Sequence, residues 1–247
     1  MNPILAQLKK SDLLLVASLD GDDLHFLLAQ ARTDHADMVE IRMDEWSSFF
    51  REDMFEKLAR FKQRIGIPML LSFRGGHPFP QWWQPVHWRT LSHVALIDVE
   101  WNPKYPWKEI AKQVKKYNVG LMISHHDYQA TPSEKALIKI AKAAYGKKAD
   151  IVKIATRAKS EGDIKTLLAV AERFAPKKAM TVMGMGPLGT LSRYITPLFN
   201  TCLVYGYIGT PTASGQLPYN ELRDRFRTLY PRYNEAFQAR ITKPVIA

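Results

Sequence analysis

The sequence has almost no cysteine and no long apolar run. Cys202 is the single cysteine among 247 residues, which excludes an internal disulfide. Every uninterrupted apolar run is shorter than the roughly 18 to 20 residues that a membrane helix needs. The N-terminal stretch MNPILAQLKKSD is also too poor in apolar residues for a signal peptide. We therefore expect a cytoplasmic protein without a membrane partner.

Common metal and nucleotide motifs are missing too. The seven histidines show no HExxH or similar spacing, so the sequence gives no support for a zinc site. Neither GxGxxG nor a P-loop follows the first apolar run, which argues against a nucleotide-binding doubly wound sheet. We predict neither a metal nor a dissociable cofactor.

Acidic residues are scarce relative to basic ones. Lysine and arginine number 35 against 24 aspartates and glutamates, which gives a formal net charge of +11 at pH 7. Such an excess favours anionic partners. The Lys-Lys pairs are dispersed along the chain and do not form one basic stripe, so an anionic small molecule is favoured over nucleic acid.

What the chain does contain is a regular alternation of apolar runs and amphipathic helical stretches. The runs number about eight, as a closed parallel barrel requires, and no linker interrupts them. We predict an α/β fold, a single (β/α)8 TIM-type barrel over residues 1–247, in preference to an open doubly wound sheet. The predicted strands are Leu13–Ser18, Met38–Met43, Met69–Phe73, Leu96–Glu100, Gly120–Ser124, Ile151–Ala155, Ala179–Met183 and Cys202–Tyr207.

Two helix starts are indicated by their capping residues. Thr131 is expected to cap a helix, with Pro132 at the first helical position and Glu134 completing a capping box. Ser160 with Asp163 predicts a second helix start ahead of an apolar face. Both predictions place a helix after a predicted strand, as the barrel requires.

Charged residues alternate with apolar ones in several predicted strands. Because neighbouring side chains of a strand face opposite sides, this parity assigns the charged ones to the barrel interior. The residues assigned there are Glu40, Arg42, Asp98, Glu100 and Lys153. Unpaired burial would cost several kcal/mol each, so these groups must pair with one another or serve a ligand. For Glu40 and Arg42 alone, a structural ion pair explains the pattern as well as a site does.

Lys153 differs from the other inward positions because apolar residues flank it on both sides. Desolvation and nearby cations lower a lysine pKa, and a fall from about 10.4 to about 7 to 8 yields an amine that can condense with a ketone. His126 shares the parity of Ser124 and Met122 at the end of its predicted strand. One of His125 and His126 is therefore expected to act as an active-site base.

Seven short motifs lie in order at the ends of successive predicted strands. They are VEIRMD at 39–44, SFRGG at 72–76, DVE at 98–100, SHHDY at 124–128, VKIA at 152–155, MGPLGTLSR at 185–193 and TASGQLP at 212–218. One motif alone would be weak evidence, but the ordered set resembles the type I 3-dehydroquinate dehydratase family over nearly the whole chain. The resemblance implies a hydro-lyase of the shikimate pathway that dehydrates 3-dehydroquinate to 3-dehydroshikimate through a lysine imine, without a cofactor.

The resemblance also implies roles for individual side chains. Lys153 would form the imine with the substrate ketone, and His126 would move protons. Arg193 would bind the substrate carboxylate, since a planar guanidinium can hold a carboxylate bidentately. The other residues lining the substrate site would be Glu40, Arg42, Arg74, Met185, Thr212 and Gln216.

A segment near residues 207–218 is rich in Gly, Thr and Ser and is expected to form a mobile lid. Within it, Thr212 stands where the family usually has a serine, and the hydroxyl is kept. Members of the family are often dimers, so the resemblance also implies a homodimer, although the sequence identifies no interface.

The segment after Arg74 departs from the family pattern. Family members often carry several more residues there, frequently ending in a glutamate, whereas Gly75 and Gly76 follow at once in this chain. A carboxylate that would orient the histidine is therefore missing from its usual place. Glu100, Glu40 or water is expected to orient His126 instead.

Two other functions are compatible with the same residues. A class I aldolase acting on a phosphorylated sugar would also use a strand-end lysine, with MGPLG at 185–189 as its phosphate-binding loop. A noncatalytic paralogue that binds a ligand or nucleic acid would use the basic charge. Turnover of 3-dehydroquinate separates the three.

Overall fold

The computed structural model describes residues 2–9, 12–21, 23–44, 54–74 and 85–242. Its strands are β1 (Leu14–Asp20), β2 (Met38–Arg42), β3 (Met69–Phe73), β4 (Leu96–Glu100), β5 (Gly120–Asp127), β6 (Ile151–Arg157), β7 (Met180–Met185), β8 (Leu203–Gly209) and β9 (Leu217–Pro218). Its helices are α1 (Pro3–Lys9), α2 (Leu24–Thr33), α3 (Met54–Ile65), η1 (Pro85–His93), α5 (Trp107–Lys116), α6 (Glu134–Gly146), α7 (Glu161–Phe174), α8 (Pro187–Ile195), η2 (Thr196–Phe199), α9 (Tyr219–Leu229) and α10 (Pro231–Ile241).

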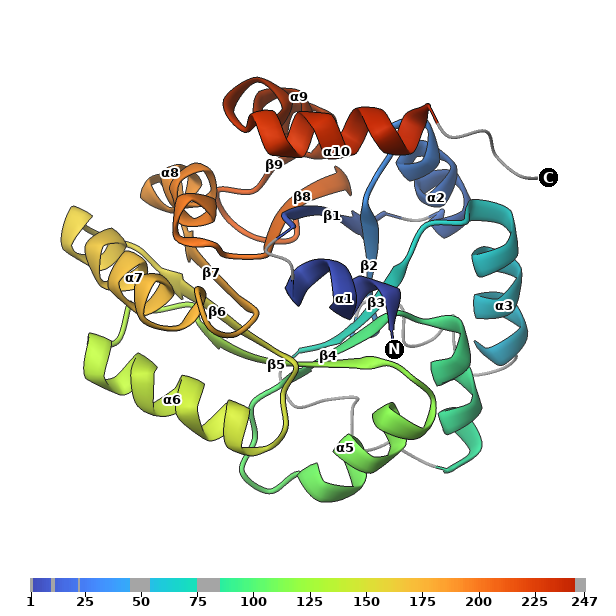
Figure 1. Ribbon diagram of the computed structural model, residues 1–247, viewed down its shortest axis with the longest axis horizontal. Helices are drawn as coiled ribbons and strands as arrows, with labels where there is room; N and C mark the ends of the chain where they lie inside the picture. Colours follow the sequence, from blue (N-terminus) through green and yellow to red (C-terminus); the bar gives the residue numbers. More distant parts are fainter. Residues whose placement is uncertain (1, 10–11, 22, 45–53, 75–84, 243–247) are drawn as a thin grey trace.

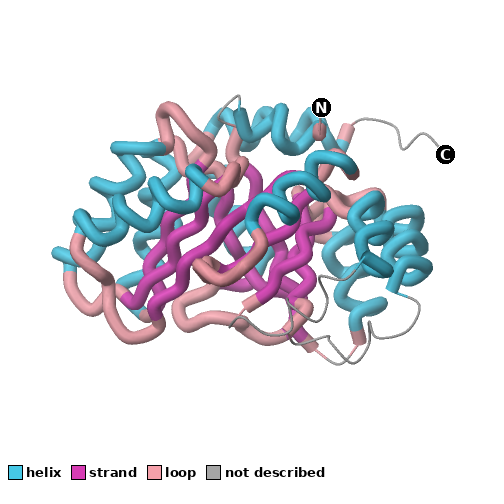
Figure 2. Tube along the Cα trace, turned by 90° about the horizontal axis from the view of Figure 1, so that it is seen from below, coloured by secondary structure: helices cyan, strands magenta, loops and turns pink. Residues whose placement is uncertain are grey.

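The strands form one parallel sheet in the order β7-β6-β5-β4-β3-β2-β1-β8-β9. Helices alternate with the strands along the chain and surround them, while the strands run through the middle of the molecule (Figures 1 and 2). This confirms the predicted TIM-type fold and all eight predicted strands. Five strands continue past their predicted C-terminal ends, to Asp20 in β1, Asp127 in β5, Arg157 in β6, Met185 in β7 and Gly209 in β8. Across the described ranges, no helix is long and apolar enough to cross a membrane.

Strand parity divides the core into two layers, as the sequence predicts. Val39, Ile97 and Ile154 pack in the layer between strands and helices. Met122 and Ile151 belong to a second cluster inside the barrel. The charged residues that alternate with the first group therefore point inward.

Helix α1 covers the N-terminal ends of the strands. Ile4 and Leu8 are buried in the interior cluster. Asn2 anchors the start of the helix, because its side-chain amide donates to the carbonyls of Ala95 at 2.7 Å and Asn118 at 3.0 Å, just before β4 and β5. The opposite, C-terminal ends of the strands are where barrel enzymes carry their chemistry.

The ladder of parallel hydrogen bonds does not continue between β7 and β8 in the described residues. A side chain bridges the two strands instead. The Thr181 hydroxyl accepts from the Leu203 N–H and donates to the Leu203 carbonyl, both at 2.9 Å. One backbone bond, from Cys202 N to Met180 O at 2.9 Å, precedes it. After Thr181, toward the C-terminal ends of β7 and β8, a side chain from outside the sheet lies between the two strands.

Helix α8 supplies that side chain. A Cβ on Gly189 would lie 2.4 Å from the carbonyl carbon of Gly184 in β7, so only glycine permits this approach. Ser192 fixes the contact, since its hydroxyl accepts the Gly184 N–H at 2.7 Å. The next residue, Arg193, is consequently directed into the interior, where it is 2% exposed.

One of the two helix-start predictions is wrong. Ser133, not Thr131, caps α6, and the Thr131 hydroxyl instead donates to the carbonyl of Arg157 at 3.0 Å. The nearby end of β6 offers Thr131 an acceptor, while Ser133 lies directly before the first turn. The start predicted at Ser160 and Asp163 is confirmed, with both reciprocal hydrogen bonds of a capping box present.

Candidate active site

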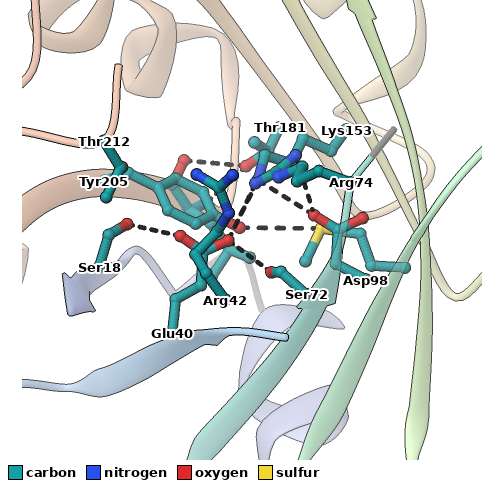
Figure 3. Close-up of polar contacts among 12 residues, drawn as sticks. Ser18, Glu40, Arg42, Ser72, Arg74, Asp98, Lys153, Thr181, Tyr205 and Thr212 are labelled. Atoms are coloured by element: carbon teal, nitrogen blue, oxygen red, sulfur yellow. Dashed lines mark hydrogen bonds and ion pairs between the residues drawn. The ribbon is translucent and has the colours of Figure 1, made fainter. Parts of the chain in front are cut away.

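A pocket opens at the C-terminal ends of the strands and brings the sequence-predicted residues together. Lys153 and His126 lie in its wall with the residues expected to line the substrate site. Figure 3 shows Lys153 and Arg74 directed toward the carboxylates of Glu40 and Asp98. The lining residues are Ser18, Glu40, Arg42, Arg74, His126, Tyr128, Lys153, Ala155, Met183, Met185, Arg193, Tyr205, Thr212, Ala213 and Gln216.

Lys153 is almost completely buried, with 2% of its surface exposed. Its Nζ lies 3.1 Å from Asp98 Oδ2, 3.7 Å from Glu40 Oε1 and 4.1 Å from the centre of the Tyr205 ring. Burial and the Arg74 cation lower the Lys153 pKa below 10.5, although both carboxylates oppose that shift. A lowered pKa increases the fraction of neutral, nucleophilic amine.

Glu40 is held by neighbours on both sides of β2. Its carboxylate accepts from the Ser18 hydroxyl in β1 and the Ser72 hydroxyl in β3, each at 2.5 Å, and from Arg74 Nη2 at 2.9 Å. Burial raises the Glu40 pKa, but the cations of Lys153 and Arg74 outweigh it, so the net pKa is lowered. Glu40 is therefore a fixed anion at the base of the pocket.

Arg74, directly after β3, contacts three charged or titratable groups. Its guanidinium bonds Glu40, lies 3.5 Å from Asp98 Oδ2 and contacts His126 Nε2. The two carboxylates raise the Arg74 pKa despite its burial, so it stays a cation. Gly75 and Gly76, on which the predicted loss of a carboxylate rests, lie outside the described residues.

His126 is fixed through its other ring nitrogen. Nδ1 lies 3.0 Å from Glu100 Oε1, and the Tyr128 ring stacks on the imidazole with centroids 6.0 Å apart. Burial, together with the cations of Arg74 and Lys153, holds the His126 pKa well below 6.5. Because a carboxylate can only accept, the neutral ring carries its proton on Nδ1, and its Nε2 lone pair faces Arg74 on the pocket side.

Arg193 is a buried cation whose hydrogen-bond partners in the described residues are all neutral. Nε donates to the Gly215 carbonyl at 3.2 Å, and Nη1 donates to the Tyr205 carbonyl at 3.3 Å and contacts Met183 Sδ at 3.5 Å. Burial lowers its pKa to about 10, still above neutrality. No carboxylate of the described ranges pairs with it. A desolvated guanidinium in this situation is suited to an anion from solution.

The β8–β9 loop closes over the pocket beside Arg193. Three hydrogen bonds tie it to α8 and its N-cap residue Gly186. The Thr190 hydroxyl and Arg193 Nε donate to the Gly215 carbonyl at 3.0 and 3.2 Å, and Gly186 N donates to the Ser214 carbonyl at 3.0 Å. Thr212 donates to Gln216 Oε1 from its N–H and from its hydroxyl, each at 2.9 Å. The ends of the expected lid belong to β8 and β9, so the loop itself spans residues 210–216.

The remaining predicted residues lie at the rim and wall of the pocket. Arg42 donates from Nε to Asp44 Oδ1 at 3.0 Å, and Met185 is buried at the end of β7. Sequence reasoning missed Ser18 and Tyr205 as pocket residues. Applying strand parity to β1 and β8 would have found both, because each polar residue alternates with buried apolar ones.

Comparison with known proteins agrees with this geometry. The family model described as type I 3-dehydroquinase matches residues 15–232. The 3-dehydroquinate dehydratase of Thermococcus onnurineus is 30% identical over 195 residues, covering 78% of this chain and 87% of the relative. That of Latilactobacillus sakei is 28% identical over 226 residues, covering 87% and 92%.

Solved structures show the same fold. The 3-dehydroquinate dehydratase from Geobacillus kaustophilus superimposes with a TM-score of 0.75 at 22% identity, covering 88% of this chain and 92% of that chain. The enzyme from Aquifex aeolicus gives 0.73 at 22% identity, covering 88% and 99%. Fold and site thus define a TIM-barrel protein with a buried amine at its catalytic end. The chain belongs to the type I 3-dehydroquinase family.

Proposed function

We propose that this chain is a 3-dehydroquinate dehydratase that works through an imine on Lys153. The observation that carries the proposal is the position of Lys153 Nζ, buried with a lowered pKa in a pocket that also holds His126 and an unpaired guanidinium. Membership of the type I 3-dehydroquinase family supports the substrate and the reaction. No step of this reaction requires a metal or a dissociable cofactor.

The first half of the reaction makes the imine. The neutral Lys153 amine attacks the substrate ketone, and the carbinolamine loses the former carbonyl oxygen as water. His126 takes one proton from the Lys153 ammonium to free the amine, passes a second from nitrogen to the former carbonyl oxygen, and returns the first to that oxygen as it leaves. The product is a protonated imine that withdraws electrons from the neighbouring carbon, so a proton on that carbon becomes acidic.

The second half removes water from the ring. Once the Arg74 guanidinium moves off it, His126 Nε2 takes the proton next to the imine and then protonates the hydroxyl that leaves from the following carbon. Water hydrolyses the conjugated imine, restores Lys153 and releases 3-dehydroshikimate. Two waters leave and one is consumed, so the net change is the loss of one water. Glu100 orients His126 through Nδ1.

The substrate carboxylate occupies the position that faces Arg193. A bidentate pair with this guanidinium would satisfy a cation whose present partners are two carbonyls and a thioether. Glu40, Arg42, Arg74 and Met185 line the substrate ring. Thr212 and Gln216 cover it from the lid near 207–218, of which residues 210–216 are the loop.

We also infer a single barrel domain over 1–247 and a cytoplasmic homodimer without a nucleic-acid partner. The dispersed lysines support the last point. Exposed leucines on α8 and η2, Leu188, Leu191 and Leu198, offer an apolar surface for a second copy. Sedimentation at several concentrations tests the dimer.

A turnover assay tests the activity. Purified protein should convert 3-dehydroquinate to a product with the absorbance of a conjugated enone and should leave a panel of sugar phosphates unchanged. Lys153→Met should abolish turnover, while the exposed control Lys139→Met should retain it. Cleavage of a sugar phosphate would instead identify an aldolase. The loop at 185–189 is poorly suited to bind the phosphate, because the Gly186 and Gly189 N–H groups already donate to backbone carbonyls. Salt-sensitive DNA binding without turnover would indicate a noncatalytic protein.

A further inference from the structure

Asp98 is a buried carboxylate that the proposed substrate contacts do not use. It is 0% exposed on β4 and does not line the pocket. Its Oδ2 accepts from Lys153 Nζ at 3.1 Å, the shortest polar contact that the amine makes in the described residues. Its Oδ1 is also buried, and no described residue donates a hydrogen bond to it. Such an unpaired carboxylate oxygen is costly to bury and calls for a function.

Glu40, the other carboxylate near the amine, is already saturated. Both of its oxygens accept from neighbours, Oε2 from Ser18 and Oε1 from Ser72 and Arg74. Its distance to Lys153 Nζ is also longer, at 3.7 Å. Asp98 is therefore the carboxylate whose charge is most available to the lysine nitrogen.

We propose that Asp98 is the counter-ion of the protonated imine on Lys153. The inference rests on the proposed function, because it requires an imine at this nitrogen. When the ammonium form of Lys153 condenses with a ketone, a C–N bond forms and the C–O bond breaks. The oxygen leaves as water with two of the three nitrogen protons, so the protonated imine keeps one N–H and the positive charge. That N–H then donates to Asp98 Oδ2, in the place of the present ammonium bond.

The charges around the nitrogen explain why this carboxylate matters. Lys153 faces Glu40 from β2, Arg74 after β3, Asp98 from β4, His126 from β5 and Tyr205 from β8. Two cations, the imine and Arg74, are balanced by the two carboxylates, with His126 and Tyr205 neutral. Without the Asp98 charge the cluster carries one net positive charge, and the imine loses its proton at a lower pH.

The pH dependence of kcat tests the proposal. Loss of the imine proton removes the electron sink, so it contributes a basic limb. Asp98→Asn should move this limb down by about 1 to 3 pH units, the shift expected when an opposite charge within about 4 to 6 Å is removed. Asp98→Glu should keep the limb nearer the wild-type position. If Asp98→Asn does not fold, Asp98→Ala offers a smaller neutral replacement for the same measurement.

Asp37→Asn is the matched control, because it removes another buried carboxylate, at the opposite ends of the strands. An unmoved limb in both neutral Asp98 variants, or an equal shift in Asp37→Asn, would overturn the counter-ion proposal. Borohydride with substrate is run in parallel on the wild type. Absence of a Lys153 adduct there would overturn the proposed function, whereas an adduct with an unmoved limb in the variants would overturn only the role of Asp98.

Discussion

Lys153 and Arg74 share two buried carboxylates, Glu40 and Asp98. The charges of this cluster shift the pKa values of both cations, of Glu40 and of His126. Glu40 and Asp98 neutralise the pair of cations, which makes their burial tolerable. His126 receives the opposite influence, since both cations disfavour its protonation. At neutral pH the site thus holds a neutral base beside the lysine that becomes the imine.

The link between His126 and Glu100 makes a prediction for kinetics. Glu100→Gln keeps the shape but removes the charge that favours the imidazolium, so the acidic limb of kcat should move to lower pH by about 1 unit. The loss of the orienting acceptor should lower kcat by about 10- to 100-fold, which is less than the roughly 10²- to 10⁴-fold expected when a general base is removed altogether. The exposed Glu172→Gln should change neither.

Steady-state rates across pH check this prediction. The wild-type acidic limb of kcat should lie below 6.5, because burial and the neighbouring cations lower the His126 pKa. An unchanged profile in Glu100→Gln would show that Glu100 does not orient the base. Full turnover by His126→Ala would remove the base assignment itself.

Arg193 makes a prediction for binding. Arg193→Ala should lower kcat/KM by about 30- to 5,000-fold, which corresponds to about 2 to 5 kcal/mol for a desolvated charge pair. Arg193→Lys should lose less, because it keeps the charge but not the planar fork. Initial rates over a range of substrate concentrations measure both variants. Wild-type kinetics in Arg193→Ala would move the carboxylate site elsewhere, with Arg74 as the next candidate.

At the scale of elements, α1 closes the end of the barrel that lacks the site. Leu8 is 3% exposed within the interior cluster, so Leu8→Ala should lower the free energy of unfolding by about 2 to 5 kcal/mol. Its kcat and KM should stay near wild type, because α1 lies at the opposite strand ends. Leu229, 58% exposed, provides the matched control, as Leu229→Ala should leave the urea midpoint almost unchanged. Equal midpoints for the two variants would contradict a packing role for α1.

Helix α10 is attached to the barrel by an ion pair between Arg240 and Asp37, and burial disfavours the charged form of Asp37. Asp37 pairs with Arg240 and accepts from the Leu15 N–H at 2.8 Å, and burial raises its pKa from 3.8 to about 6. A carboxyl with a raised folded-state pKa stabilises the fold fully below its ordinary pKa and loses that contribution as pH rises through about 6.

Urea unfolding at two pH values tests this linkage. Between about pH 5 and about pH 8 the wild type should lose about 1 kcal/mol more stability than Asp37→Asn, in which position 37 does not titrate. The comparison with the variant cancels the contribution of other titrating groups. Stability curves that stay parallel between the two proteins would show that Asp37 keeps an ordinary pKa.

For the whole molecule, strand parity accounts for how much could be predicted from the sequence. It assigned Glu40, Asp98 and Lys153 to the interior, and all three are buried there. Alternation of apolar runs and helices likewise predicted the barrel, because each strand needs a helix to cover its outer face. These inferences depend on local pattern alone.

Features that depend on contacts distant in the chain could not be predicted. The interruption between β7 and β8 depends on Thr181 meeting Leu203 and on the close approach of Gly189 to Gly184. Arg193 enters the pocket only through that arrangement. Thr131 could not be predicted for the same reason. Its hydroxyl donates to the carbonyl of Arg157 in β6 and does not cap the following helix.

Chemical trapping tests the central claim, that Lys153 carries the reaction as an imine. The protein is treated with borohydride in the presence of 3-dehydroquinate or its product, digested, and mapped by mass spectrometry. One adduct should form, on the peptide that contains Lys153, and Lys153→Met should form none. An adduct on another lysine, or no adduct while turnover continues, would contradict the account.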